Sequence, residues 1–276
     1  MRVFDCFMFF NELDLIEIRF QELWDVVDYF VISEADVTHS NIPKPFYFKD
    51  NWDRFKPYHE KIRLLSHSQM PNDSDPMIRD RHQRWLLKDG LKDLTDQDLV
   101  ITSDLDEIPR AQVIELIKNN QAQYYDRYIL KHPLFKYKLN FIKLEPIVAH
   151  SNIIVTRANV FTNNQQEREY TFPWNSKPNN THFVDHGGWS WSYYGDDEHC
   201  LTKIRSFAHA PATNIPALTE NHSVDWFVKN KNFLYGDKCE YVILDDYFPK
   251  CITDNLDKYH HMIVPDAELT VFDLYP

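Results

Sequence analysis

Glycine is scarce in this sequence. The chain has 276 residues and only five glycines, at positions 90, 187, 188, 195 and 236. No arrangement of them gives G-x-G-x-x-G or G-x-x-x-x-G-K-[ST], the turns that hold phosphate in Rossmann and P-loop proteins. Those two classes are therefore excluded. If the chain binds a diphosphate, a metal ion and basic side chains must hold it.

Positive charge and cysteine are also limited. The chain has 30 Lys and Arg against 42 Asp and Glu, a formal net charge of -12. We expect no nucleic acid partner, because such binding depends on Lys and Arg neutralising phosphates. Cys6, Cys200, Cys239 and Cys251 form no C-x-x-C pair. They predict reduced thiols rather than a disulfide framework or a zinc site.

Long apolar runs are missing as well. Met1 leads directly into a mixed segment, 2–7, with no signal-peptide pattern. No stretch approaches the roughly 18 apolar residues that a membrane span needs. We therefore expect a cytoplasmic protein without a membrane span. Length and composition predict a single domain, 1–276, and no pattern indicates its oligomeric state.

Predicted strands and helices alternate through the first 120 residues. Apolar runs of strand length occur at 3–10, 29–33 and 99–102. Helical spacing of apolar residues follows Asn11, a candidate helix cap, and recurs at 79–94 and 111–119. This alternation predicts an α/β fold with a mostly parallel central sheet flanked by helices. In such sheets ligands bind beyond the carboxyl ends of the strands.

The pattern changes after residue 120. Short aromatic and β-branched runs at 124–130, 134–141 and 152–156 predict antiparallel strands added to the sheet.

An acidic turn, Asp104-Leu105-Asp106-Glu107, follows the strand at 99–102. In extended geometry Asp104 and Asp106 point the same way. Mg²⁺ and Mn²⁺ prefer oxygen ligands and commonly keep one or two protein carboxylates plus substrate phosphates. The alternative is that one aspartate caps the next helix and the other is solvated. The position directly after a buried strand favours a metal and diphosphate site.

Three segments resemble glycosyltransferase family 17. Residues 11–19 resemble its Asn-Glu-x-Asp-Leu-x-x-x-Arg segment, which is followed here by Val27-Asp28 and Glu34. Residues 104–109 resemble its Asp-x-Asp-Glu-Ile-Pro signature. Gly188-Trp189, with Ser192 and Lys203, resembles its Gly-Trp-x-x-Ser block. One departure is Ser190, where the family often has His.

The resemblance implies a GT-A type fold and an inverting enzyme that uses Mn²⁺ or Mg²⁺. The implied donor is a UDP-sugar, GlcNAc by resemblance with xylose or another sugar left open, and the acceptor is a glycan or glycoprotein. The donor-binding half would be about 1–120 and the acceptor and catalytic half about 121–276. Asp104 and Asp106 would bind metal and diphosphate. His209 would complete the metal shell or be a structural histidine, and His186 is a second candidate.

An inverting transfer needs a carboxylate that accepts the proton of the acceptor hydroxyl. Glu198 matches an acidic position of the family, with Asp197 and Asp185 as alternatives, although the acidic run 196–198 is equally typical of a solvated turn. Donor contacts are expected from residues near the ends of predicted strands, from the predicted helix at 79–94 and from the Gly-Trp block. These residues are Asn11, Glu12, Glu34, Arg84, Glu107 and Trp189. Arg84 is alternatively a surface ion pair, and Trp189 a packed strand residue.

Two other functions remain open from the sequence. A non-catalytic, Ca²⁺-dependent carbohydrate-binding protein would use the carboxylates structurally and would have no affinity for UDP. A metal-dependent phosphodiester or pyrophosphate hydrolase generally needs more converging carboxylates than this turn supplies.

Overall fold

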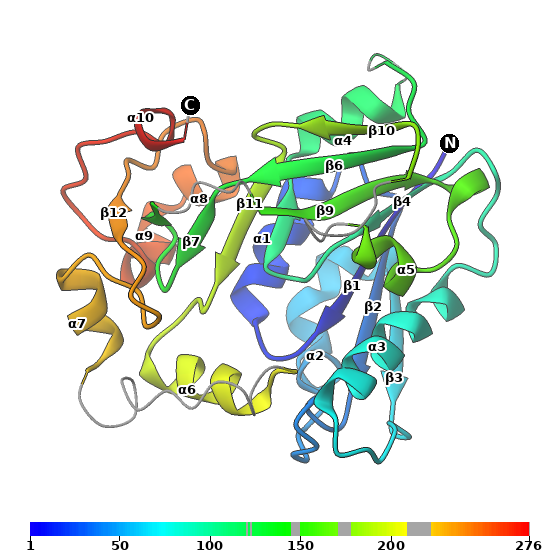
Figure 1. Ribbon diagram of the computed structural model, residues 1–276, viewed down its shortest axis with the longest axis horizontal. Helices are drawn as coiled ribbons and strands as arrows, with labels where there is room; N and C mark the ends of the chain where they lie inside the picture. Colours follow the sequence, from blue (N-terminus) through cyan, green and yellow to red (C-terminus); the bar gives the residue numbers. More distant parts are fainter. Residues whose placement is uncertain (120, 122, 145–149, 171–177, 209–221, 276) are drawn as a thin grey trace.

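The computed structural model describes residues 1–119, 121, 123–144, 150–170, 178–208 and 222–275, which form two sheets. The first sheet has the strand order β10-β6-β9-β4-β1-β2-β3 and lies at the right of Figure 1. Its strands are β1 (Val3–Phe9), β2 (Tyr29–Ala35), β3 (Ile62–His67), β4 (Leu99–Thr102), β6 (Arg127–His132), β9 (His150–Arg157) and β10 (Thr181–Val184).

Strand direction in this sheet agrees with the sequence pattern. β1 pairs in parallel with β2 and β4, β2 with β3, and β6 with β10. β9 runs antiparallel between β4 and β6. The predicted α/β fold, with a mostly parallel central sheet and added antiparallel strands, is confirmed.

Alternate residues of β1 pack on opposite faces, as a strand buried on both sides requires. Phe4 and Cys6 pack against Leu87 and Leu91, whereas Phe7 belongs to the large core cluster that includes the buried face of helix α1.

The helices and 3₁₀ turns that accompany this sheet are α1 (Leu13–Leu23), α2 (Tyr47–Asp50), η1 (Trp52–Lys61), α3 (Pro76–Leu86), η2 (Leu87–Gly90), α4 (Ala111–Lys118), η3 (Ala158–Val160) and α5 (Asn164–Glu169).

Some predicted boundaries were wrong. The helix expected at 79–94 begins at Pro76, because the Asp75 side chain accepts a hydrogen bond from the backbone amide of Met77, and it ends at Leu86. Asn11 is not the cap of α1, since Glu12 holds that position without a side-chain cap bond.

The second sheet has the order β12-β8-β7-β11-β5 and lies at the left of Figure 1. Its strands are β5 (Glu107–Pro109), β7 (Leu134–Lys136), β8 (Phe141–Lys143), β11 (Gly188–Ser192) and β12 (Cys239–Tyr241). The strand expected at 134–141 is divided into β7 and β8, because Tyr137 has a φ of 61°. Residues 103–106 connect β4 of the first sheet to β5 of the second, so the acidic turn joins the two sheets.

The remaining elements are α6 (Asp197–Ser206), α7 (Val224–Lys229), α8 (Lys250–Thr253), α9 (Leu256–Tyr259), η6 (His260–Met262) and α10 (Val271–Leu274). They pack in two clusters: α6 and α7 contribute to a second, smaller one, and the elements after them contribute to the large core. One cluster of buried residues contains Val3 and Phe7 of β1 together with Phe248 and Val271 near the C-terminal end. Among the described helices, none is long and apolar enough to cross a membrane.

Candidate functional site

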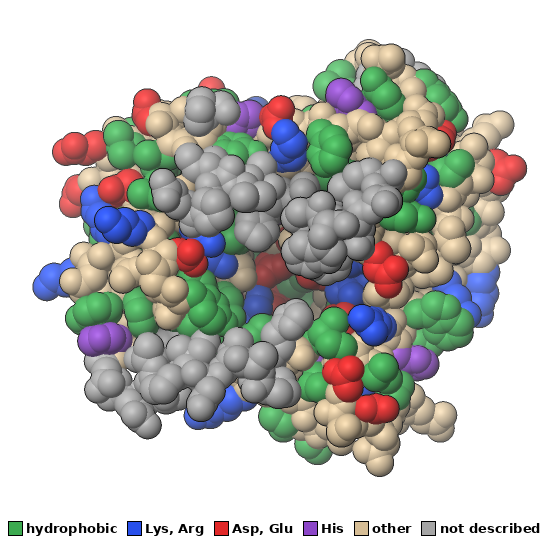
Figure 2. Space-filling view, in the orientation of Figure 1, with side chains coloured by type: hydrophobic (Ala, Val, Ile, Leu, Met, Phe, Trp, Pro, Cys, Tyr) green, Lys and Arg blue, Asp and Glu red, His purple; other side chains and the backbone are tan. Residues whose placement is uncertain are grey.

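A cavity of about 790 Å³ lies beyond the carboxyl ends of β1, β2 and β4, where the two sheets meet. Figure 2 shows it as a hollow with acidic and basic side chains inside. The charged residues that line it come from the second sheet, from three helices and from loops that follow strands of the first sheet: Glu12, Lys44, Asp80, Arg81, Arg84, Asp104, Asp106, Glu107, Lys136, Arg168, Glu169 and Lys203. The location agrees with the ligand site expected for a sheet of this type.

The acidic turn is held from beneath by Arg19 of α1. Arg19 is completely buried and forms a two-point ion pair with Asp5 of β1, at 2.7 and 2.6 Å. Its Nη1 also donates to three carbonyl oxygens of the turn, those of Asp104, Leu105 and Glu107, at 2.9 to 3.1 Å. Arg19 therefore fixes the backbone that presents the acidic side chains, a role its place in the 11–19 motif did not reveal.

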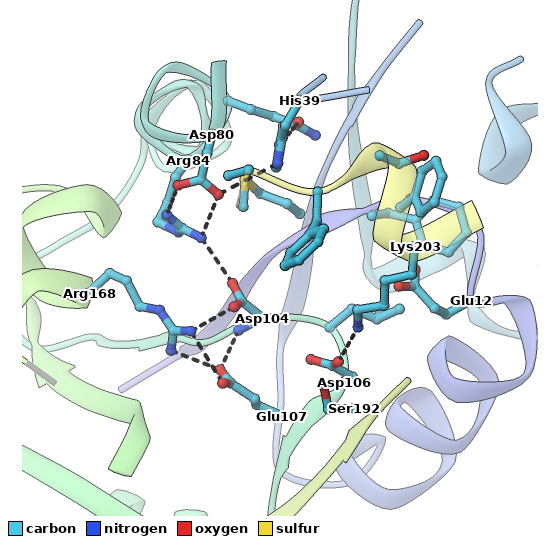
Figure 3. A pocket seen from close by; sticks show the side chains of 18 of the residues that line it. Glu12, His39, Asp80, Arg84, Asp104, Asp106, Glu107, Arg168, Ser192 and Lys203 are labelled. Atoms are coloured by element: carbon cyan, nitrogen blue, oxygen red, sulfur yellow. Dashed lines mark hydrogen bonds and ion pairs between the residues drawn. The ribbon is translucent and has the colours of Figure 1, made fainter. Parts of the chain in front are cut away.

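Asp104 is held between two arginines (Figure 3). Arg84 of α3 donates to Oδ1 at 3.0 Å, and Arg168 of α5 donates to Oδ2 at 2.6 Å. Arg84 is itself paired with Asp80, one helical turn away. Burial alone would raise the pKa of Asp104, but the two guanidinium groups bring it well below its ordinary value.

Both carboxylate oxygens of Glu107 are already hydrogen-bonded to protein groups. Its carboxylate accepts from Arg168 at 2.8 and 3.2 Å, from Asn152 at 2.8 Å, and from the backbone amide of Asp104 at 2.8 Å. Arg168 thus bridges Asp104 and Glu107. Arg168 could not be predicted from the sequence, because a single arginine in the polar stretch 163–169 carries no pattern that links it to a turn some 60 residues earlier.

Asp106 is buried and faces the second sheet. Its Oδ2 accepts from Lys203 of α6 at 2.8 Å, and its backbone oxygen accepts from the amide of Trp191. Burial, with the neighbouring charges of Glu107 and Asp104, raises the pKa of Asp106, although Lys203 opposes that shift. In the part of the chain that the structure describes, Oδ1 of Asp106 has no hydrogen-bond partner.

The structure brings together five of the predicted site residues and leaves the other described ones outside the cavity lining. Those that line the cavity are Glu12, Arg84, Asp104, Asp106 and Glu107.

Asn11, Glu34 and Trp189 are absent from the cavity lining. Glu34 is buried, and its carboxylate accepts hydrogen bonds from the amides of Phe48 and Lys49. Trp189 is 1% exposed, within the core. These positions therefore give Glu34 and Trp189 structural roles rather than the predicted donor contacts.

The carboxylates predicted to act as base also lie outside the cavity lining. Glu198 and Asp197 are in the exposed first turn of α6, where Asp197 accepts from the amide of Val224. Asp185 is exposed and pairs with Lys131 at 2.7 Å. These positions do not support the predicted role as base, because the cap residue Asp196 starts the helix with its first turn in solvent.

The structure describes only one of the two histidines predicted for the metal shell. His186 does not line the cavity, and its Nδ1 lies 3.2 Å from the hydroxyl of Tyr247. His209 lies outside the described residues.

The site fits a divalent cation in the type of its donor atoms. Carboxylate oxygens suit Mn²⁺ and Mg²⁺, and Asp106 has one oxygen without a basic partner, whereas both oxygens of Asp104 accept from arginines. The described residues contain no group of three or more His, Cys, Asp or Glu side chains arranged to hold a metal. Phosphate oxygens of a ligand are further donors of the type that such a cation accepts.

Comparison with known proteins gives one family. The model of glycosyltransferase family 17 matches residues 1–237. The β-1,4-mannosyl-glycoprotein 4-β-N-acetylglucosaminyltransferase of Rattus norvegicus is 33% identical over 125 residues, 42% of this chain and 23% of the relative. The Homo sapiens protein of that name is 34% identical over 116 residues, 39% and 22% of the two chains. The matched region thus spans less than a quarter of these relatives.

Solved structures are similar only at a low level. A mannosyltransferase from Pyrobaculum calidifontis, in complex with GDP-Man and Mn²⁺, is 10% identical with a TM-score of 0.40, covering 83% of this chain and 67% of that one. The inositol-1-phosphate CTP transferase from T. maritima is 8% identical with a TM-score of 0.39, covering 80% and 97%. Similarity this low says nothing about function.

Proposed function

The chain belongs to glycosyltransferase family 17, and from that membership we propose that it transfers a sugar from a UDP-sugar to a glycan hydroxyl with inversion, giving a β linkage. GlcNAc is the proposed sugar, because the relatives are named N-acetylglucosaminyltransferases. The observation that carries the proposal is the cavity at the strand ends, in which an acidic turn is surrounded by basic side chains. A nucleoside diphosphate and a divalent cation are the ligands that such a mixture of charges accommodates.

A divalent cation, Mn²⁺ or Mg²⁺, is proposed to bind at Asp106 together with the donor phosphates. When bound, it would neutralise negative charge on the departing diphosphate. Asp104 contributes to the same site by orienting Arg84 and Arg168, whose guanidinium groups line the cavity. The planar guanidinium group matches phosphate oxygens in geometry, so these two arginines are the proposed contacts of the diphosphate.

Glu12 is the proposed catalytic base. Of the acidic residues that line the cavity, Asp80, Asp104 and Glu107 are bonded to arginines, and Asp106 to Lys203. Glu169 accepts from two glutamines of its own helix. The carboxylate of Glu12 accepts only the amide of Asn11 among the described groups, and Figure 3 places it beside Lys203. It is therefore the carboxylate most available to an acceptor hydroxyl.

A thermal-shift experiment tests the donor site. UDP with Mn²⁺ at about 100 times the dissociation constant should add about 2.7 kcal/mol of stability, a rise in Tm of roughly 5 to 10 °C. EDTA should abolish the rise, and so should Asp106→Asn. Asp185→Asn is the matched control, because it removes an acidic group outside the cavity. Absence of any shift with UDP and Mn²⁺ would favour a Ca²⁺-dependent carbohydrate-binding protein instead.

The sugar itself is tested separately. Slow, metal-dependent hydrolysis of a panel of UDP-sugars should be fastest for UDP-GlcNAc. Faster hydrolysis of UDP-xylose, UDP-galactose or UDP-glucose would replace GlcNAc as the proposed donor sugar while leaving the transferase proposal in place.

A further inference from the structure

Lys136 is a buried lysine that faces the cavity. It ends strand β7 and lines the cavity although only 6% of the residue is exposed. In the pairing of β7 with β11 it lies opposite Ser192, which Figure 3 shows beside Asp106. Lys136 therefore belongs to the wall that the second sheet contributes, close to the acidic turn.

The ammonium group of Lys136 has no anionic partner in the described structure. Its contacts are two aromatic rings, with Nζ 4.4 Å from the ring centre of Phe233 and 5.4 Å from that of Tyr193. Three other basic residues of the lining each have a carboxylate partner: Arg84, which is also buried, and Arg168 and Lys203, which are partly exposed.

A buried cation without an anion is costly, and ring contacts offset only part of that cost. Burial and then the charge of Lys203 lower the pKa of Lys136 to about 7, although Asp106 acts in the opposite direction. An anionic ligand in the cavity would supply the missing partner.

Lys203 approaches the same place from α6. Its Nζ bonds Asp106 and lies 5.6 Å from the ring centre of Tyr193, the ring that Lys136 also contacts. Two ammonium groups thus lie around one aromatic ring and face one cavity. Their mutual repulsion falls when an anion with several oxygens binds between them. A phosphate group has that charge and that number of acceptors.

We infer that Lys136, together with Lys203, binds the β-phosphate of the nucleoside diphosphate and stabilises the charge that develops on it. This inference rests on the proposed function. In the transfer, the bond between sugar C1 and the β-phosphate oxygen breaks, and its electron pair stays on that oxygen. The acceptor oxygen bonds to C1, and its proton passes to the base. Because the β-phosphate gains a negative charge, the lysines bind the departing diphosphate more strongly than the intact donor.

Calorimetric titration with uridine, UMP, UDP and UDP-GlcNAc, each with Mn²⁺, tests this role. Lys136→Met should weaken UDP binding about 10- to 100-fold, the range for a hydrogen bond to a charged group. Binding of uridine and UMP should change by less than about twofold, because neither has a β-phosphate. Lys136→Arg should retain most of the UDP affinity. Lys138→Met is the matched control, since the Lys138 amine bonds the carbonyl of His261 outside the cavity.

The melting temperature separates ligand binding from a structural role. Lys136→Met removes a buried, unpaired charge, so its Tm should equal or exceed that of the wild type. Lys136→Gln repeats the titration with a polar side chain if the methionine variant does not fold. Unchanged UDP affinity in a folded variant overturns the inference, as does equal weakening of uridine, UMP and UDP. A raised KM for the acceptor alone also overturns it. Wild-type protein that binds no UDP overturns the proposed function as well.

Discussion

At the scale of single residues, the deepest support of the site is Arg19. It links the carboxylate of Asp5, in the first strand, to the carbonyl oxygens of a turn that lies about 85 residues later in the chain. Neither Arg19 nor Asp5 faces the cavity. Their pair therefore acts on function by holding the acidic turn in place.

Replacement of Arg19 should be costly. Arg19→Met leaves Asp5 buried without its partner, and the free energy of unfolding should fall by about 3 to 5 kcal/mol, as urea denaturation would measure. The double variant Asp5→Leu/Arg19→Met removes both charges and should recover most of that loss. It should still bind UDP and Mn²⁺ weakly, because the turn carbonyls lack their donor. Full recovery of UDP affinity in the double variant would contradict the positioning role.

Substitutions of Glu12 and Glu198 should affect turnover differently, because only Glu12 is proposed as the catalytic base. Glu12→Gln should reduce the turnover of acceptor about 10²- to 10⁴-fold, the usual contribution of a general base. UDP affinity should change little, because the base does not act on the nucleotide. Glu198→Gln and Asp185→Asn serve as controls and should retain full turnover. Steady-state kinetics with a working acceptor would decide, and a large loss in Glu198→Gln would reinstate the base expected from the sequence.

Asp98 should make stability depend on pH. Its buried carboxylate accepts bonds from Arg2 and Thr95, and although burial raises its pKa, these bonds bring the pKa down to about 2. A folded-state pKa below the unfolded value of 3.8 stabilises the protein above pH 4, and the gain is lost as pH falls toward 2.

Asp98→Asn should therefore lower the free energy of unfolding by about 2 kcal/mol at pH 7. Urea denaturation from pH 7 down to pH 3 should show the difference between variant and wild type shrinking below pH 4. A difference that stays constant over this range would mean that the ionised carboxylate is not the stabilising form.

At the scale of elements, α6 shows why the acidic run 196–198 could be interpreted either as part of a catalytic site or as a solvated turn. Three acidic residues begin the helix, yet only Asp196 caps it, through a bond from the amide of His199. The same helix carries Lys203 into the cavity, about two turns after the cap residue. The acidic run therefore serves to start the helix, and the helix delivers a basic side chain.

The contribution of the Asp196 cap to stability can be measured against a control residue in the first turn of α6. Asp196→Ala should lower the free energy of unfolding by about 0.5 to 2 kcal/mol, the usual cost of a lost cap. Glu198→Ala, an exposed acidic residue two positions later, should change it by less than about 0.5 kcal/mol. Thermal unfolding followed by circular dichroism would compare them, and equal losses would show that charge near the helix start matters more than the cap bond.

At the scale of the whole molecule, the C-terminal segment is part of the core. The family match ends at residue 237, but the large buried cluster also includes residues beyond it: Val242, Tyr247, Phe248, Ile252, Tyr259, Met262, Val271 and Tyr275. Each buried apolar side chain of this size contributes about 1.5 to 3 kcal/mol. Their sum is similar to or larger than the net stability of a typical domain, about 5 to 15 kcal/mol.

A chain cut after residue 237 should therefore not fold cooperatively, and the chain of residues 1–276 should unfold in one transition. Calorimetry of the longer chain and circular dichroism of the shorter one would test both statements. A shorter chain with a sharp unfolding transition and UDP binding would show that the domain ends near residue 237.

The sequence by itself determined the α/β alternation and the acidic turn, because both are local: buried strands are apolar runs, and the turn follows such a run directly. Only the tertiary structure decided which side chains surround the turn. Arg168, Lys136 and Lys203 come from separate segments after residue 120, and their approach depends on how the second sheet packs beside the first. It also placed Glu198 and Asp185 on the exposed surface outside the cavity lining, which the spacing of residues along the chain cannot reveal.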